Sequence, residues 1–207
     1  MRTAISLGRP GWIYRLDYKK LIIIAFLFRL ILASGYDVFT CVTNRDLLVP
    51  DGRFYSTVGC YAALLLNGYD KGSFTEEMMP IHQFNRKTFY DVYRQENKFF
   101  KSSSSSHESA FYYYVVGIIY FIFGYFPLAV RIFNIILSIG STYLIFIIAK
   151  RQFGDLTANL FLLIALFLPT QVMYSVTLAR DFLRMFVISL ILWLIYGGVL
   201  WQRKQRM

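Results

Sequence analysis

The sequence predicts an all-α polytopic membrane protein with about four transmembrane helices and amphipathic juxtamembrane helices in a long first external loop. Of its 207 residues, 57% are hydrophobic and 19% are aromatic, whereas only 16% are charged. A helix needs about 20 apolar residues to cross roughly 30 Å of hydrocarbon. Apolar runs of about that length predict spans near residues 20–37, 131–149, 156–171 and 182–201. Residues 1–207 are treated as a single membrane domain.

Basic residues predict how these spans are oriented. They gather in the tail at residues 1–20, at Lys150 and Arg151, and after the last apolar run. The positive-inside rule places all three clusters, and both termini, in the cytoplasm. The net charge of +10 therefore indicates membrane topology and no nucleic-acid partner. We expect a multi-pass protein of a bacterial inner membrane, or of the endoplasmic reticulum in a eukaryote, with residues 38–130 outside.

One apolar run, AFYYYVVGIIYFIFGYFPLAV at residues 110–130, does not fit this four-span topology. If it crossed the membrane, the Lys150 and Arg151 cluster would move to the outside. Gly117, Gly124 and Pro127 interrupt it. We therefore expect a re-entrant or interface-lying helix here, and a fifth span is the alternative.

The external segment also contains an amphipathic helix. Phe54, Val58, Tyr61 and Leu65 recur at helical spacing, and Asn67-Gly68 is a typical stop signal. Asp51 comes just before this helix, where an acid can cap the backbone or serve in chemistry. Two interpretations of Cys60 stay open: a disulfide with Cys41, or a small buried residue of the helix.

Charged residues within or beside the spans are candidates for binding. Arg29 lies inside the first span, so it must snorkel or face a polar cavity. Arg180 and Arg184 are four residues apart and share a helix face. Such a pair can clamp a phosphate or simply anchor the helix at the interface. His82 and His107 have no partner at metal-ligand spacing, so zinc is not expected.

Four segments, in order, resemble a known group of membrane enzymes. They are PDGRFYSTVGCYAALLLNG, HESAFYYYVVGIIYFIFG, RIFNIILSIGSTYLIFIIAKRQFG and MYSVTLARDFLRMF. This order is similar to that of the GT-C superfamily of integral-membrane glycosyltransferases, which includes protein O-mannosyltransferases and the lipid A aminoarabinose transferase. Many members carry a second acid where this chain has Gly52, and members usually continue through more spans.

The resemblance implies transfer of a sugar from a polyprenyl-phosphate donor to a hydroxyl of a glycan, lipid or protein acceptor, with inversion. It implies Asp51 as general base, with Asp181 or Glu108 as a second acid. The candidate substrate-binding residues are Arg53, Glu108, Arg131, Arg180 and Arg184. No cofactor is required, although a divalent metal between carboxylates and phosphate stays open.

Two other functions fit the sequence. A non-enzymatic membrane subunit, or a truncated or degenerate relative of such transferases, would explain Gly52 and the small number of spans. A second chain would then supply further spans. A lipid-carrier transporter should instead have polar residues facing one another at membrane depth, and apart from Arg29 the predicted spans hold few.

Overall fold

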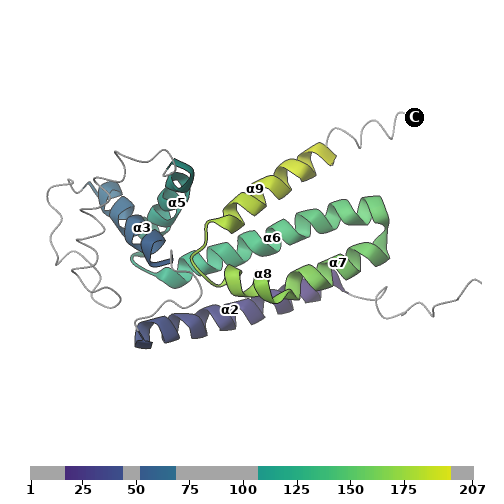
Figure 1. The fold of residues 1–207 in the computed structure, drawn as a ribbon, viewed down its shortest axis with the longest axis horizontal. Coiled ribbons are helices and arrows are strands. Elements are labelled where there is room, and N and C mark those ends of the chain that lie inside the picture. Colours follow the sequence, from purple (N-terminus) through teal and green to yellow (C-terminus); the bar gives the residue numbers. More distant parts are fainter. Residues whose placement is uncertain (1–16, 44–51, 69–106, 197–207) are drawn as a thin grey trace, which may run out of the picture.

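The computed structural model describes residues 17–43, 52–68 and 107–196. Every regular element in these ranges is a helix, so the predicted all-α fold class is confirmed there. Figure 1 shows their arrangement. The helices are α2 (Tyr18–Thr43), α3 (Gly52–Leu66), α5 (His107–Phe123), α6 (Pro127–Phe153), α7 (Asp155–Phe167), α8 (Pro169–Ser175) and α9 (Asp181–Leu194).

Among the described residues, two helices are long and apolar enough to cross a membrane. They are the first 23 residues of α2 and the whole of α6, which has 27 residues. The helices α7 and α8 are long enough to cross a membrane only if they are taken together, and the chain bends by 51° between them. The helix α9 has 14 residues, and residues 197–201 of the span predicted at 182–201 lie outside the described residues.

The bend between α7 and α8 interrupts the span that was predicted over residues 156–171. Pro169 begins α8, and the preceding Leu168 has an extended backbone with ψ of 121°. A proline lacks the amide proton that would continue the helix, and it forces the residue before it out of helical geometry. The turn therefore leaves backbone carbonyls near the end of α7 without helical partners.

Arg29 of α2 supplies one of these missing partners. Its guanidinium donates to the carbonyl oxygen of Leu166 and to Oγ of Ser138 on α6, both at 2.9 Å. Arg29 is 0% exposed, so its side chain points into the protein, where it bonds these two polar groups, and does not snorkel. One arginine thus ties α2, α6 and the broken α7 together.

The helices α2, α6 and α7 form the bundle, and α9 packs along α6 (Figure 1). Small and branched apolar residues fill the space between them, including Ala25, Ile135 and Leu162. At one end, Tyr18 at the start of α2 stacks against Tyr143 and Phe146 near the end of α6. The start of α2 and the α6–α7 turn with Lys150 therefore lie at the same end, as the positive-inside topology requires.

Helices α3 and α5 form a separate pair at the opposite end of the bundle (Figure 1). The amphipathic helix predicted from Val58 and Leu65 is confirmed, and it ends before Gly68, whose φ is +84°. Two glycines let the pair approach closely. A Cβ added to Gly117 would lie 2.6 Å from Cβ of Ala62, and one added to Gly59 would collide with Val116.

The apolar run at residues 110–130 is divided between two helices. The helix α5 ends at Phe123, Gly124 has a φ of +72°, and Pro127 begins α6. Proline is well suited to a first helical turn, so α6 begins at Pro127. The last four residues of the run therefore belong to α6, which is long enough to cross a membrane. The helix α5, which holds the rest of the run, has 17 residues and is shorter than the roughly 20 residues that a membrane span needs. Its apolar outer side chains, such as Phe111 and Phe123, are 66% and 65% exposed, which suits a helix lying at a membrane interface.

Cys60 lies in the packed interface of α3 and carries a free thiol. The interpretation as a small buried residue therefore holds, and the disulfide with Cys41 does not form in this structure. Burial raises the pKa of Cys60 to about 12, so the thiol stays protonated and unreactive at neutral pH.

Candidate functional site

The junction between the bundle and the α3–α5 pair is built around Asn134 on α6. Its Nδ2 donates to the carbonyl oxygen of Thr177 at 2.8 Å and to the hydroxyl of Tyr112 on α5 at 3.1 Å. Asn134 is 0% exposed. A buried amide whose two partners come from two other parts of the chain fixes those parts relative to its own helix. The α8–α9 connection and α5 are therefore held against the same turn of α6.

One turn earlier on α6, Arg131 forms an ion pair with α2. Its Nη1 lies 2.6 Å from Oδ1 of Asp37, and the two side chains are 3% and 21% exposed. Nη1 also donates a hydrogen bond to the carbonyl oxygen of Ala33 at 3.4 Å. The guanidinium also lies over the ring of Tyr36, 4.9 Å from its centre. Arg131 was predicted to contact the phosphate of the donor. In this structure its guanidinium is paired with the Asp37 carboxylate instead.

The pair α3–α5 presents a cluster of hydroxyl groups beside this junction. Oγ of Ser56 lies 2.9 Å from the hydroxyl of Tyr120 and donates to that of Tyr125 at 3.3 Å. The rings of Tyr120 and Tyr125 are 5.1 Å apart. Tyr55 packs edge-on against Tyr112 with ring centres 5.2 Å apart. These contacts connect the helix that follows Asp51 in the sequence to the start of α6.

The first turn of α9 carries three of the predicted site residues. Asp181 and Arg184 are exposed, and Arg180 is partly buried at the position that caps the helix. Burial raises the pKa of Tyr112 well above its ordinary value, and the charge of Asp181 adds to this rise. Asp181 begins α9 shortly after Thr177, whose carbonyl oxygen accepts from Asn134, so the acid follows the junction directly in the chain.

The other predicted site residues lie outside what the structure describes. Asp51 precedes the first described residue of α3, and the side chains of Arg53 on α3 and Glu108 on α5 are not described. The helices that carry Arg53 and Glu108 are described, whereas Asp51 lies outside the described residues. The roles predicted for these three residues stay predictions.

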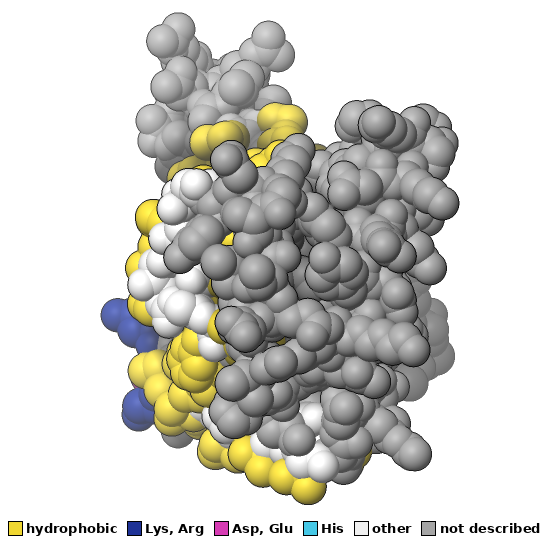
Figure 2. All heavy atoms as spheres, turned by 90° about the vertical axis from the view of Figure 1, so that its left-hand side faces the viewer, with side chains coloured by type: hydrophobic (Ala, Val, Ile, Leu, Met, Phe, Trp, Pro, Cys, Tyr) yellow, Lys and Arg dark blue, Asp and Glu magenta, His cyan; other side chains and the backbone are white. Residues whose placement is uncertain are grey.

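Figure 2 views the molecule from the end that carries α3 and α5. Along the described part of this face, exposed hydrophobic side chains lie beside Lys or Arg side chains. Apolar surface next to cations is typical of a protein segment at the boundary between lipid and water. Among the side chains that the structure describes, no group of three His, Cys, Asp or Glu residues is placed to hold a metal ion.

Sequence reasoning missed Asp37 and Asn134 as parts of this junction. A signal for both was present, because each is a polar residue within or at the end of a long apolar run. Such residues at membrane depth usually face the protein interior and pair with one another. Their partners are about 40 to 100 residues away in the sequence, at Thr177 and Arg131, and no local pattern identifies those.

Searches of curated proteins and of solved structures gave no match to this chain. Three of the four motif segments, all but the one that begins at Pro50, lie within the stretch that a family model recognises. Residues 107–206 match the model of the family described as dolichyl-phosphate-mannose-protein mannosyltransferase, which confirms the predicted relationship to GT-C-type membrane glycosyltransferases.

Proposed function

We propose that this membrane protein transfers a sugar, with mannose as the first candidate, from a polyprenyl-phosphate carrier to an acceptor hydroxyl on the external face of a multi-pass domain. The family match over residues 107–206 is the observation that carries the proposal. The matched residues include Asn134 with its hydrogen-bond partners and the start of α9. Both lie at the end of the bundle opposite the basic α6–α7 turn, which is the predicted external end.

In this proposal Asp51 is the general base. It accepts the proton of the acceptor hydroxyl while the hydroxyl oxygen forms a bond to the anomeric carbon of the sugar. The bond from that carbon to the phosphate oxygen breaks at the same time, and polyprenyl phosphate leaves with the bonding electron pair. A single displacement of this kind inverts the anomeric centre. The second acid is Asp181 or Glu108.

Cations stabilise the charge that develops on the departing phosphate. Arg180 and Arg184 are one helical turn apart at the start of α9, at the junction. Arg131 is more deeply placed and already paired with Asp37. We assign the direct phosphate contact to Arg180 and Arg184, and Arg53 is a further candidate. Arg131 can contact the phosphate only if its ion pair with Asp37 first breaks.

The proposed transfer requires no cofactor, and a divalent metal between the carboxylates and the phosphate is its one open variant. Hard cations prefer several oxygen ligands. Asp181 is the exposed described acid at the junction that suits this role. A chelator titration decides between the two versions: unchanged transfer in excess EDTA supports the metal-free mechanism, and loss that Mg²⁺ or Mn²⁺ restores supports the metal.

The direct test is a transfer assay in vesicles that contain the purified chain. The donor is synthetic polyprenyl-phosphate mannose, and the acceptors are a Ser/Thr peptide, a glycan and a lipid. We expect sugar transfer from the lipid-linked donor and none from a nucleotide-linked mannose, with an inverted anomeric centre in the product. Transfer from the nucleotide donor alone, or retention at the anomeric carbon, would contradict the proposal.

A further inference from the structure

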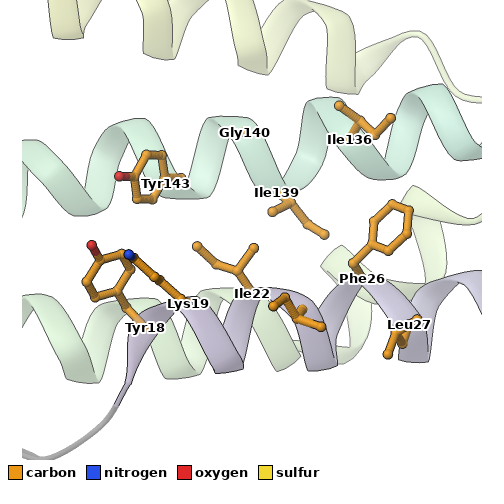
Figure 3. A pocket seen from close by; sticks show the side chains of 10 residues that line it. Tyr18, Lys19, Ile22, Phe26, Leu27, Ile136, Ile139, Gly140 and Tyr143 are labelled. Atoms are coloured by element: carbon orange, nitrogen blue, oxygen red, sulfur yellow. The ribbon is translucent and has the colours of Figure 1, made fainter.

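A cavity of about 600 Å³, open on its outer side where Ile23 and Leu27 are more than half exposed, lies between α2 and α6, far from the junction and near the basic end of the bundle (Figure 3). Its walls are almost entirely apolar and include Ile22, Phe26 and Ile139. It extends along α2 from Tyr18 to Leu27, which corresponds to about 14 Å at the helical rise of roughly 1.5 Å per residue. None of the residues assigned to glycosyl transfer lines it.

Three polar groups gather at one end of this cavity. Figure 3 shows the hydroxyls of Tyr18 and Tyr143 and the ammonium of Lys19 at the same end, away from Phe26 and Leu27. The two tyrosine rings stack with centres 6.4 Å apart. A cation and two hydroxyls above an apolar channel match a molecule with an anionic head and a hydrocarbon chain.

Lys19 differs from the two nearby lysines, Lys20 and Lys150, in its position at the cavity. Lys20 pairs with Asp17 at 3.9 Å, and Lys150 pairs with Asp155 at 3.0 Å. Neither of these two lysines lines the cavity, whereas Lys19 does. An anionic group at the cavity mouth would therefore find its charge partner in Lys19.

The shape of the walls argues against a helix from another chain as the occupant. Close packing of helices in membranes needs small residues on the contact surface. The cavity is lined mainly by Ile, Leu, Phe and Tyr, and Gly140 is the one small residue among its lining. The space beside Gly140 is needed by α9, because a Cβ there would lie 3.0 Å from the ring of Phe186. A flexible hydrocarbon chain fits such a bulky, irregular channel better.

We propose that this cavity binds one acyl chain of an anionic phospholipid, with the lipid phosphate at Lys19 and the two tyrosine hydroxyls. The basic end of the bundle is the predicted cytoplasmic end, where anionic lipids and basic residues meet. The site would hold α2 against α6 from the lipid side. This role is separate from glycosyl transfer, and the proposal stands or fails without any assay of that activity.

The test is native mass spectrometry of the full chain in detergent with equal amounts of phosphatidylglycerol and phosphatidylcholine. We expect one retained phosphatidylglycerol per chain. Lys19→Gln should weaken its retention roughly fivefold, the factor for one lost lysine charge near a membrane phosphate. Lys20→Gln is the matched control, because Lys20 is adjacent, 79% exposed and outside the cavity, and it should retain the lipid.

A second variant, Ile139→Trp, fills the apolar channel and should abolish retention while Lys19 is intact. Thermal unfolding shows whether this variant is folded, and added phosphatidylglycerol should raise the melting temperature of the unmutated chain but not of Lys19→Gln. Equal lipid retention in Lys19→Gln and Lys20→Gln would overturn the proposal. Displacement of the lipid by polyprenyl phosphate would also overturn it, because the cavity would then bind the sugar donor's carrier. A dimer without bound lipid that Ile139→Trp disrupts would overturn it too, because the cavity would then be an interface between two chains.

Discussion

The bundle and the junction each contain a buried arginine, and the two have different kinds of partner. In the bundle, Arg29 bonds only a serine hydroxyl and a backbone carbonyl. At the junction, Arg131 lies beside the Asp37 carboxylate and over an aromatic ring. The bundle thus uses a cation to complete a broken helix, whereas the junction holds a charge pair close to the proposed site.

This difference separates structural from functional use of charge. A buried cation with neutral partners bears a desolvation cost that its hydrogen bonds only partly offset. A buried ion pair is costly to break, because removing one member leaves the other uncompensated. We therefore expect changes at the two arginines to differ in size and in what they affect.

The largest loss of stability is expected for Arg131→Gln, which leaves Asp37 without its counter-charge. The free energy of unfolding should fall by about 3 kcal/mol, the low end for a buried pair because Asp37 is 21% exposed. Chemical unfolding in detergent measures it. Adding Asp37→Asn to the variant should restore part of the loss, and a double variant less stable than the single one would contradict the pairing.

A smaller loss is expected for Arg29→Met, which keeps the length of the side chain. It removes the donors to Ser138 and Leu166 but also removes a buried charge, so we expect a loss of about 1–2 kcal/mol. The same unfolding measurement applies. A loss equal to that of Arg131→Gln would show that the two arginines are not held differently.

Packing of the α3–α5 pair gives a third test. Gly117→Ala places a Cβ 2.6 Å from Ala62, so overpacking should cost about 1 kcal/mol and shift α3. The matched control is Gly35→Ala on α2, where nothing lies within 4 Å of the added Cβ. That control should stabilise the protein slightly, because alanine favours helices. Equal effects of the two variants would contradict the close packing.

The smallest effect on stability is expected where function is assigned. Replacing both Arg180 and Arg184 by Gln should change the free energy of unfolding by less than about 0.5 kcal/mol. The affinity for polyprenyl-phosphate mannose should fall by roughly tenfold, measured by equilibrium binding in detergent. A folding defect without a separable loss of binding would return both residues to anchoring the helix at the interface.

The sequence was sufficient where structure depends on neighbours in the chain. The period of Val58 and Leu65 with the Asn67-Gly68 stop predicted α3 closely, and composition predicted an all-helical membrane protein. Distant contacts were not predictable. The helix α2 continues to Thr43, past the expected end at residue 37, in a region where Arg131 neutralises Asp37.

The candidate site shows the same division. The order of motifs identified the start of α9 and the family relationship, both of which depend on local sequence. The burial of Arg131 and the Asn134 hub depend on how helices cross, which residue spacing does not encode. The break at Leu168 was signalled by Pro169, but only the folded bundle shows that Arg29 bonds the carbonyl beside it.

The central claim is that the end of the bundle carrying the junction performs sugar transfer with Asp51 as base, and the variants Asp51→Asn and Asp51→Ala test it most directly. Asparagine caps a helix about as well as aspartate but cannot accept the proton, so Asp51→Asn should lower transfer from polyprenyl-phosphate mannose by roughly 10² or more. The melting temperature should barely change, whereas Asp51→Ala should also lose about 1 kcal/mol of stability. Transfer by Asp51→Asn at the unmutated rate would contradict the account and leave Asp51 as a helix cap.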